Sequence, residues 1–194
     1  MTVIIDYKCG NLRSVSNALR RIGHEYRITG DAEAIKAASH VILPGVGEAS
    51  STMEALKNSG LADVLPSLTQ PTLGICIGMQ LMCRFSEEGN VPCLGIFDVE
   101  VRKLRVPNDL KVPHIGWNTV TRLASPLADG ISEGAYFYYV HSFAPEIGSQ
   151  TAAITEYGTA FSAILQNANF FGTQFHPEKS GEAGERLLAN FLKL

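Results

Sequence analysis

The feature that most limits the folds open to this chain is the alternation of short apolar runs with helical patterns in its first 85 residues. Four runs of four or five residues fit buried strands, and apolar residues at helical spacing follow each run. The expected strands are residues 2–6, 25–28, 40–43 and 71–75, and the expected helices are residues 11–22, 32–38, 48–57 and 77–83. Strands that alternate with helices form parallel sheets with helices on both faces. The first half therefore predicts an α/β fold.

The chain beyond Cys93 is instead rich in strand patterns, which are separated mostly by Gly, Pro or Asn. The expected strands are residues 95–104, 117–123, 136–140, 151–157, 161–166 and 170–175, and a final helix is expected over residues 181–192. Some of these closely spaced strands must be antiparallel. We therefore expect one flavodoxin-like α/β domain over residues 1–194, with a mostly parallel central sheet flanked by helices and an antiparallel extension.

The composition disfavours several classes of function. The formal net charge is −3 and the 16 Lys and Arg residues are scattered, so the sequence shows no basic patch for nucleic acid. The N-terminus has neither a basic segment nor a long apolar one, which predicts no signal peptide and no transmembrane helix. We therefore expect a cytoplasmic protein that binds neither nucleic acid nor a membrane. No cluster of residues indicates a metal or another cofactor.

The four cysteines, at positions 9, 76, 83 and 93, contain no Cys-x-x-Cys pair, and a reducing compartment disfavours disulfides. Cys83 follows Cys76 by seven residues, on what is expected to be one helix face, so a metal or redox pair is conceivable. No histidine lies nearby in the sequence to complete a zinc site, which disfavours that interpretation.

One cysteine stands between an expected strand and an expected helix, in the run Gly74-Ile75-Cys76-Ile77-Gly78. This pattern is typical of a nucleophile elbow, a tight and strained turn that presents its side chain at the carboxyl edge of the sheet, where α/β folds bind ligands. The helix dipole would favour the thiolate there. The alternative is a buried structural cysteine, and the motif alone does not decide between the two.

A base for such a nucleophile is available where the last expected strand ends, in the run Gln174-Phe175-His176-Pro177-Glu178. His176 is placed to accept the thiol proton, and strand alternation would put Glu178 on the same side to orient the imidazole. The alternative is a surface histidine beside a loop proline. The histidines at positions 24, 40, 114 and 141 have no acid at this spacing, although those at 114 and 141 are expected in loops of interest.

The run Pro44-Gly45-Val46-Gly47 follows an expected strand and precedes an expected helix, at the same sheet edge as Cys76. Its backbone N–H groups fit an oxyanion hole, because glycines let the backbone approach a tetrahedral intermediate closely. We expect the oxyanion to lie against the N–H of Gly47 in this run and the N–H of Ile77, which follows Cys76. The alternative is an ordinary glycine-rich turn. The run is not a phosphate-binding P-loop, because no Gly-Lys-Ser/Thr follows it.

Taken together and in this order, the cysteine elbow, the His-Pro-Glu strand end and the Pro-Gly-Val-Gly loop resemble the class I, or triad, glutamine amidotransferases over nearly the full chain. The resemblance implies the fold of that family and a reaction in which glutamine acylates Cys76, while His176 and Glu178 complete the triad. It also implies the positions that hold glutamine, namely Gly45, Gly47, Gln80, Glu88, Ser142 and Phe143. An acid for the ammonium group and main-chain donors for the carboxylate suit a free amino acid.

Four further runs narrow the resemblance to one branch of the family, namely residues 6–12, 113–118, 139–143 and 176–180. In that branch, the glutaminase passes ammonia to a (β/α)₈-barrel cyclase subunit, which makes imidazole glycerol phosphate and aminoimidazole carboxamide ribotide in histidine biosynthesis. The resemblance implies a heterodimer with that cyclase, in which Trp117, Asn118 and Lys179 face the partner and His114 lies near the ammonia exit. Without the resemblance, Trp117 would be interpreted as a core residue.

Two other functions remain open from the sequence. A sister glutaminase that serves pyridoxal phosphate, guanylate or anthranilate synthesis would share the triad but should lack the Pro-His-Ile-Gly-Trp-Asn run. A non-enzymatic binding or redox-sensing α/β domain would keep a reactive elbow cysteine. The chain also departs from the family's opening motif at Lys8, where glycine is common, and Cys9 is unusual at such a turn; we assign Cys9 no role.

Overall fold

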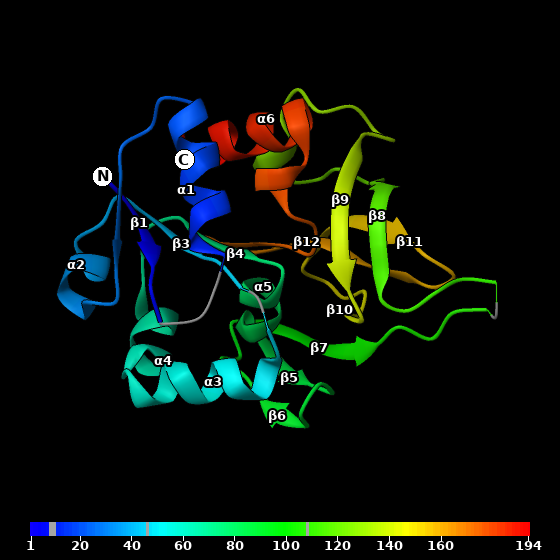
Figure 1. Ribbon diagram of the computed structural model, residues 1–194, viewed down its shortest axis with the longest axis horizontal. Helices are drawn as coiled ribbons and strands as arrows, with labels where there is room; N and C mark the ends of the chain where they lie inside the picture. Colours follow the sequence, from blue (N-terminus) through cyan, green and yellow to red (C-terminus); the bar gives the residue numbers. More distant parts are fainter. Residues whose placement is uncertain (8–10, 46, 108) are drawn as a thin grey trace.

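The computed structural model describes residues 1–7, 11–45, 47–107 and 109–194, and it is built around one seven-stranded sheet (Figure 1). The strands are β1 (Thr2–Ile5), β2 (Tyr26–Thr29), β3 (His40–Leu43), β4 (Thr72–Ile75), β11 (Thr151–Glu156), β12 (Ala160–Asn167) and β13 (Phe170–Thr173). Their order is β11-β12-β13-β4-β3-β1-β2, and the five strands from β13 to β2 are parallel. β11 and β12 pair antiparallel. The predicted fold class, a mostly parallel sheet with an antiparallel extension, is confirmed.

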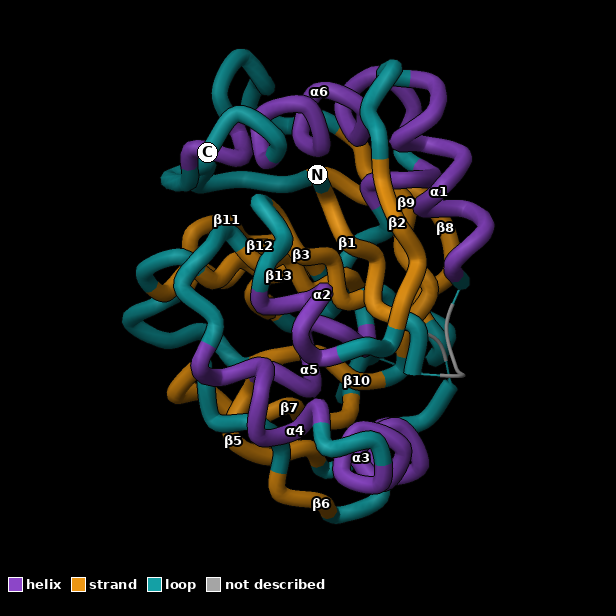
Figure 2. Tube along the Cα trace, turned by 90° about the vertical axis from the view of Figure 1, so that its left-hand side faces the viewer, coloured by secondary structure: helices purple, strands orange, loops and turns teal. Residues whose placement is uncertain are grey.

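Helices cover both faces of this sheet, as the alternating pattern predicts. α1 (Leu12–Arg21) and α6 (Gly181–Phe191) lie on one face, and α3 (Ala49–Asn58), α4 (Leu61–Val64) and α5 (Ile77–Met82) lie on the other (Figures 1 and 2). α2 (Ala32–Lys36) connects β2 to β3, and 3-10 helices form at Leu65–Ser67, Pro126–Ala128 and Pro177–Lys179. Side-chain caps start α1 and α2: Asn11 accepts from the Ser14 N–H at the start of α1, and Asp31 accepts from the Ala34 N–H at the start of α2.

Two smaller sheets add to the central one. The first has the order β10-β7-β5-β6, from Phe143–Pro145, Phe97–Lys103, Cys83–Ser86 and Val91–Pro92. The second is the antiparallel pair β8 (His114–Thr119) and β9 (Tyr136–His141). The strand expected at residues 117–123 therefore begins earlier, at His114. β5, β6 and β10 were not predicted, because these segments form strands through pairing with β7 or with each other rather than through a pattern of their own.

The interpretation of Cys76 and Cys83 as neighbours on one helix face is wrong. α5 ends at Met82, and Cys83 begins β5. Cys83 is completely buried, its Sγ donates to the Met79 carbonyl at 3.5 Å, and burial raises the pKa of its thiol well above the ordinary value. Cys83 is therefore a structural residue of the core.

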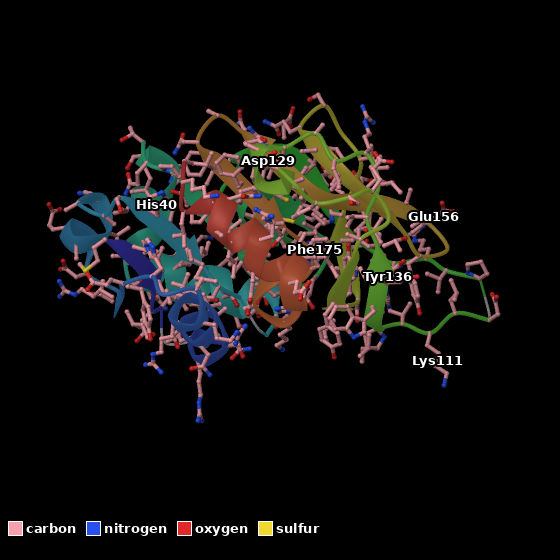
Figure 3. The ribbon with its side chains drawn as sticks, turned by 90° about the horizontal axis from the view of Figure 1, so that it is seen from above. His40, Lys111, Asp129, Tyr136, Glu156 and Phe175 are labelled. Atoms are coloured by element: carbon pink, nitrogen blue, oxygen red, sulfur yellow. The ribbon has the colours of Figure 1, made fainter. Side chains whose placement is uncertain are left out.

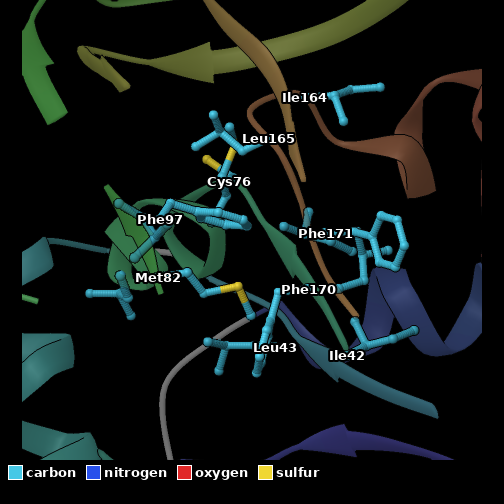
Figure 4. Packing of buried hydrophobic residues seen from close by; sticks show 14 of the residues in the cluster. Ile42, Leu43, Cys76, Met82, Phe97, Ile164, Leu165, Phe170 and Phe171 are labelled. Atoms are coloured by element: carbon cyan, nitrogen blue, oxygen red, sulfur yellow. The ribbon is translucent and has the colours of Figure 1, made fainter. Parts of the chain in front are cut away.

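The hydrophobic core holds in place the carboxyl ends of the central strands, where Cys76 lies. All residues of β4 and β13 are buried, and the cluster around them includes Phe97, Phe171 and Cys76 (Figure 4). α5 approaches β3 so closely that a Cβ on Gly78 would lie 2.0 Å from the Leu43 carbonyl oxygen. The backbone at the end of β4 and the start of α5 is consequently held tightly against β3.

The β8–β9 pair projects beside the central sheet (Figure 1), and several of its apolar side chains are exposed. Ile115 is 60% exposed, Trp117 55% and Tyr136 61%, so the interpretation of Trp117 as a core residue is wrong. Figure 3 places Tyr136, with Glu156 and Lys111, at the opposite end of the molecule from His40.

Two observations from the sequence lie outside the described residues: the departure at Lys8 and the unusual Cys9. Within the described ranges, no helix combines the length and the apolar character needed to cross a bilayer.

Candidate active site

Cys76 occupies the turn between β4 and α5, where it is the residue preceding the helix. Its φ is +53°, in the region that non-glycine residues rarely adopt, and its N–H donates to the Thr173 carbonyl of β13 at 2.7 Å. Backbone strain of this kind persists only where the surrounding structure holds it. The predicted strained elbow is therefore present at the carboxyl edge of the sheet.

His176 and Glu178 form a buried pair in which Nδ1 and Oε1 are 2.8 Å apart. His176 is 4% exposed and Glu178 5%, so the interpretation as a surface histidine is wrong. The reason given for their proximity was also wrong, because β13 ends at Thr173 and Glu178 lies in the 3-10 helix Pro177–Lys179. The tight turn, rather than strand alternation, brings the carboxylate to the imidazole.

Backbone and hydroxyl contacts fix the position of His176. Its N–H donates to the Tyr138 carbonyl of β9 at 2.9 Å, and its carbonyl accepts from the Ser180 Oγ at 2.6 Å. The same Ser180 Oγ accepts from the Tyr138 N–H at 3.0 Å. β9 and the residue that precedes α6 therefore hold the backbone of His176 from two sides.

The charge on His176 depends on its two partners. Burial alone would lower the pKa of His176, but the hydrogen bond and negative charge of Cys76, together with those of Glu178, outweigh burial and raise the pKa to about 10. The imidazole is therefore protonated at neutral pH in this arrangement, opposite the cysteine sulfur.

A cavity of about 290 Å³ opens beside Cys76, at the small end of the range for small-molecule sites. It is lined by Gly45, Gly47, Cys76, Ile77, Gln80, Glu88, Pro113, Val140, His141, Ser142, Phe143, His176 and Lys179. The structure thus brings together all the positions expected to hold glutamine, both expected oxyanion donors, and two triad members. Glu178 lies behind His176, and Lys179, expected at the partner interface, also lines this cavity.

Glu88 is the acid in this cavity besides the triad. Burial raises the pKa of Glu88, the Ala49 N–H that donates to its Oε2 at 2.9 Å lowers it, and the nearby charge of Glu48 raises it. Its carboxylate is thereby held at the start of α3, across from the carboxyl edge of β4.

The remaining interface residues are not equally exposed. His114 is 3% exposed and lies on β8, and His141 lies opposite it on β9, so neither is in a loop as expected. The His114 ring is stacked between Tyr139 and Tyr157, with ring centroids 4.9 and 3.9 Å away. Asn118 is half-buried, and its Nδ2 donates to the Glu156 carbonyl at 3.0 Å.

His114 and His141 form a hydrogen-bonded pair with fixed tautomers. His141 Nδ1 lies 2.9 Å from the Phe143 carbonyl, which can only accept, so this nitrogen carries the proton. Burial lowers the pKa of His141 to about 3 and of His114 to about 4, so both rings are neutral. His141 Nε2 therefore accepts from His114 Nδ1, 3.0 Å away, and His114 Nε2 accepts from Asn118 Nδ2 at 3.4 Å.

A polar residue that was not predicted from the sequence lies behind the nucleophile. Gln174 is completely buried, and its Nε2 donates to Cys76 Sγ at 3.7 Å. Its Oε1 accepts from Gln80 Nε2 at 2.9 Å. The signal was a glutamine in the segment expected as a strand over residues 170–175, two residues before His176, because glutamine is unusual at a buried position.

Among the described residues, no group of three or more His, Cys, Asp or Glu side chains is arranged to hold a metal ion. The arrangement of Cys76, His176 and Glu178 suits nucleophilic attack by sulfur with an adjacent acid–base residue.

Comparison with known sequences gives consistent matches. Residues 3–194 match the family model described as glutamine amidotransferase class-I. The chain is 55% identical over 192 residues to imidazole glycerol phosphate synthase subunit HisH of Bacteroides fragilis, with 98% of each chain covered. It is 53% identical to the subunit of the same name from Bacteroides thetaiotaomicron, with 98% of each covered, and 48% identical to that of Idiomarina loihiensis, with 99% and 97% covered.

Solved structures share the fold at low sequence identity. A putative GMP synthase subunit from Thermoplasma acidophilum aligns with a TM-score of 0.75 and 18% identity, covering all of this chain and 92% of that one. The structure of PurLQS from Thermotoga maritima aligns with a TM-score of 0.73 and 18% identity, covering 99% and 97%. These likenesses show the fold alone.

Proposed function

The chain belongs to the class-I glutamine amidotransferases, and from that premise we propose that it hydrolyses glutamine and supplies the ammonia to the cyclase subunit of imidazole glycerol phosphate synthase, in histidine biosynthesis. The relatives named as subunits of that synthase support the proposal, because they are 48–55% identical over nearly the whole chain. The observation that carries the chemistry is the convergence of Cys76, His176 and Glu178 beside one cavity.

In the first half of the proposed reaction, the Cys76 thiolate attacks the side-chain amide carbon of glutamine. His176 takes the thiol proton, so that Cys76 attacks as the thiolate, and the raised pKa of His176 suits the imidazole to hold that proton. His176 then donates this proton to the leaving nitrogen, ammonia departs, and a thioester remains on Cys76. Glu178 holds the imidazole by its Nδ1 and leaves Nε2 for the proton transfers.

In the second half, His176 is neutral and removes a proton from water, which attacks the thioester carbon. The carbon–sulfur bond breaks, glutamate leaves, and the proton returns the pair to its starting state. In both halves, backbone N–H groups at Gly47 and Ile77 are the proposed donors to the oxyanion, because both residues line the cavity beside the sulfur.

Recognition of glutamine is assigned to the other lining residues. Glu88 supplies a negative charge for the substrate ammonium group, and main-chain donors near Ser142 and Phe143 suit its carboxylate. Gly45 has no room for a side chain, because a Cβ there would lie 2.3 Å from the Gly78 nitrogen. Gln80 forms the inner wall of the cavity, where its contacts to Phe143 and Gln174 hold it in place.

The proposed partner is a (β/α)₈-barrel cyclase subunit that forms a heterodimer with this chain. Ammonia released into water would be protonated at neutral pH and would lose its nucleophilicity, so a sealed passage between the two proteins has a chemical purpose. Trp117, Asn118 and Lys179 are the candidate interface residues, and His114 is a candidate neighbour of the ammonia exit. We expect the chain alone to be a poor glutaminase until the partner orders the loop that contains Gly45 and Gly47.

The experiment that tests this function measures glutamate release from glutamine by the chain alone, with the cyclase subunit, and with the cyclase and its nucleotide substrate. We expect strong stimulation in the complex. Activity that ignored the cyclase would instead indicate a glutaminase that serves another synthase. Absence of glutamate under every condition would contradict the enzyme assignment.

The matched variants are Cys76→Ser and Cys93→Ser. Cys76→Ser removes the proposed nucleophile, so we expect glutamate release to fall at least about 100-fold while binding to the cyclase persists. Cys93 lies outside the cavity, with its Sγ 3.6 Å from the Val91 carbonyl, and Cys93→Ser should keep the activity.

A further inference from the structure

We propose that Gln174 is a further catalytic residue, which donates a hydrogen bond to the sulfur of Cys76 and favours the reactive thiolate. The inference rests on the proposed function, because it concerns the same nucleophile. The Gln174 Nε2 lies 3.7 Å from Cys76 Sγ, and the Gln174 side chain is completely buried. A buried amide needs partners for its polar atoms, and the sulfur is the acceptor that this one has.

The orientation of the Gln174 amide is set by Gln80. Gln80 Nε2 donates to the Phe143 carbonyl at 2.8 Å and to Gln174 Oε1 at 2.9 Å. A backbone carbonyl only accepts, so the Gln80 nitrogen must face Phe143 and, with its second hydrogen, Gln174. Consequently Gln174 turns its oxygen toward Gln80 and its nitrogen toward the sulfur.

The opposite orientation of Gln80 would lose the bond to Phe143, because its Oε1 would face the Phe143 carbonyl and two acceptors would repel each other. The observed orientation leaves the buried Gln80 Oε1 without a donor among the residues that the structure describes. One unpaired acceptor is the smaller loss, so the observed orientation is favoured.

The Phe143 carbonyl is itself held firmly. It belongs to β10, which pairs antiparallel with β7, and it also accepts the proton on His141 Nδ1 at 2.9 Å. Both lone pairs of this oxygen are therefore occupied, one by His141 and one by Gln80. The fixed carbonyl determines the orientation of the Gln80 amide, and the Gln80 amide in turn determines the orientation of the Gln174 amide.

This contact acts on two steps of the proposed reaction. A neutral N–H donor stabilises a thiolate more than a thiol, and it does so more strongly in a buried site than in water. Before attack, Gln174 therefore favours the charged sulfur opposite the protonated His176. When water opens the thioester, the same donor stabilises the departing thiolate. The Gln174 amide does not titrate, so its contribution is constant across the working pH range.

The test compares Gln174→Met with Gln70→Met. Methionine is similar in length but has no N–H donor, and Gln70 is a control because its Nε2 donates to the Ile35 carbonyl at 2.8 Å, away from the cavity. The readout is the rate at which iodoacetamide alkylates Cys76 as a function of pH, located by mass spectrometry. Alkylation requires the thiolate but not glutamine.

We expect Gln174→Met to slow alkylation at pH 7 about tenfold and to move the half-maximal rate to higher pH, as loss of a hydrogen bond to a charged group implies. In the same variant the kcat for glutamine hydrolysis should also fall, while the KM for glutamine should change less than about twofold. The titratable groups that line the cavity, Glu88, His141, His176 and Lys179, are unchanged in this variant. An alkylation profile that matched the unmodified protein and Gln70→Met would overturn the proposal.

A second variant covers the case in which Gln174→Met fails to fold. Gln80→Met removes the group that orients Gln174, so the alkylation profile should shift in the same direction by a smaller amount, and no shift would contradict the inference. A failure of the proposed function would be recognised by a different result. If Cys76→Ser retained glutaminase activity, the function would be wrong, whereas the alkylation profiles would still report on the contact to Gln174.

Discussion

At the scale of residues, the protonation of His176 determines the chemistry that the site can perform. Cys76, His176 and Glu178 lie in series, and the pKa of His176 stands near 10 because the two flanking groups outweigh its burial. An imidazole with a raised pKa is suited to hold the thiol proton during attack and then to deliver it to the leaving nitrogen. The raised pKa of His176 therefore depends on the positions of both Cys76 and Glu178.

Replacing Glu178 by Gln should lower the pKa of His176, because one of the groups that raise it loses its charge. We expect the imidazole titration, followed by NMR of a labelled histidine, to move to lower pH. The glutaminase kcat in the complex should fall at least about 100-fold, as for loss of an oriented acid–base residue. Glu33→Gln, in an exposed pair with Lys36 on α2, is the control and should change neither quantity.

The same variant has a predicted effect on stability. A group whose folded-state pKa is raised stabilises the protein fully below its unfolded pKa, near 6.5, and the contribution disappears as pH rises through about 10. The loss in free energy of unfolding caused by Glu178→Gln should therefore be larger at pH 6 than at pH 10, as measured by urea unfolding. An equal loss at both values would contradict this charge assignment.

Single residues also mark the limits of prediction from the sequence. His176 and Glu178 were paired correctly because a base needs an orienting acid, although the structural reason given was strand alternation rather than a 3-10 turn. Gln174 was missed because its role depends on Gln80 and Cys76, which are 94 and 98 residues away in the chain. Contacts between distant positions leave no periodic signal.

At the scale of elements, the geometry of the elbow depends on how α5 begins. Three strands, β3, β4 and β13, end at one edge, and the first turn of α5 packs against the end of β3. The glycines at 74 and 78 allow this approach, because a Cβ on either would come within 2.7 Å of backbone atoms. The sequence predicted the elbow from these glycines, and the structure explains why both are needed.

Gly78→Ala should distort this junction. The new Cβ would meet the Leu43 carbonyl at 2.0 Å, so α5 or β3 must move, at a cost of about 2 kcal/mol or more in free energy of unfolding. Gly23→Ala is the comparison, because Gly23 has a φ of +71° but no neighbour within 4 Å, and it should cost only about 1 kcal/mol. Urea unfolding of the two variants measures both, and equal losses would show that the close approach is unimportant.

The elements themselves were predictable where they were long or strongly patterned. The parallel strands and flanking helices of the first half followed from alternating periods, and the β-rich second half followed from its turn residues. The short strands β5, β6 and β10 were not, because they exist through pairing with β7 or with each other rather than through their own pattern. β5 also follows α5 without a break, which hid the end of the helix.

At the scale of the whole molecule, the apolar face of β8 and β9 lies next to the cavity. The Trp117 ring packs edge-on against Tyr138, with centroids 5.9 Å apart, and the Lys179 ammonium lies 5.9 Å from the centre of the same Tyr138 ring. Lys179 also lines the cavity. A partner that covered Trp117 would therefore lie two side chains from the proposed glutamine site.

Trp117→Ala should weaken binding to the cyclase about 30-fold, or roughly 2 kcal/mol, as for a large aromatic residue at the centre of an interface. Ile28→Ala is the matched control, since Ile28 is 41% exposed on β2, at the other edge of the central sheet. Isothermal titration calorimetry measures both affinities, and thermal unfolding of the free chain should be nearly unchanged. Equal affinities would place the interface elsewhere.

The Phe143 carbonyl accepts two hydrogen bonds, and for this reason the chain of hydrogen bonds behind the nucleophile cannot conduct protons. Donors run toward this oxygen from both sides, from His114 through His141 and from Gln80, and an amide oxygen that receives two hydrogens has none to pass on. A proton cannot hop along a chain of hydrogen bonds whose two halves point at each other. A proton at the Cys76 end of this chain therefore cannot reach His114 on β8 through the Phe143 carbonyl.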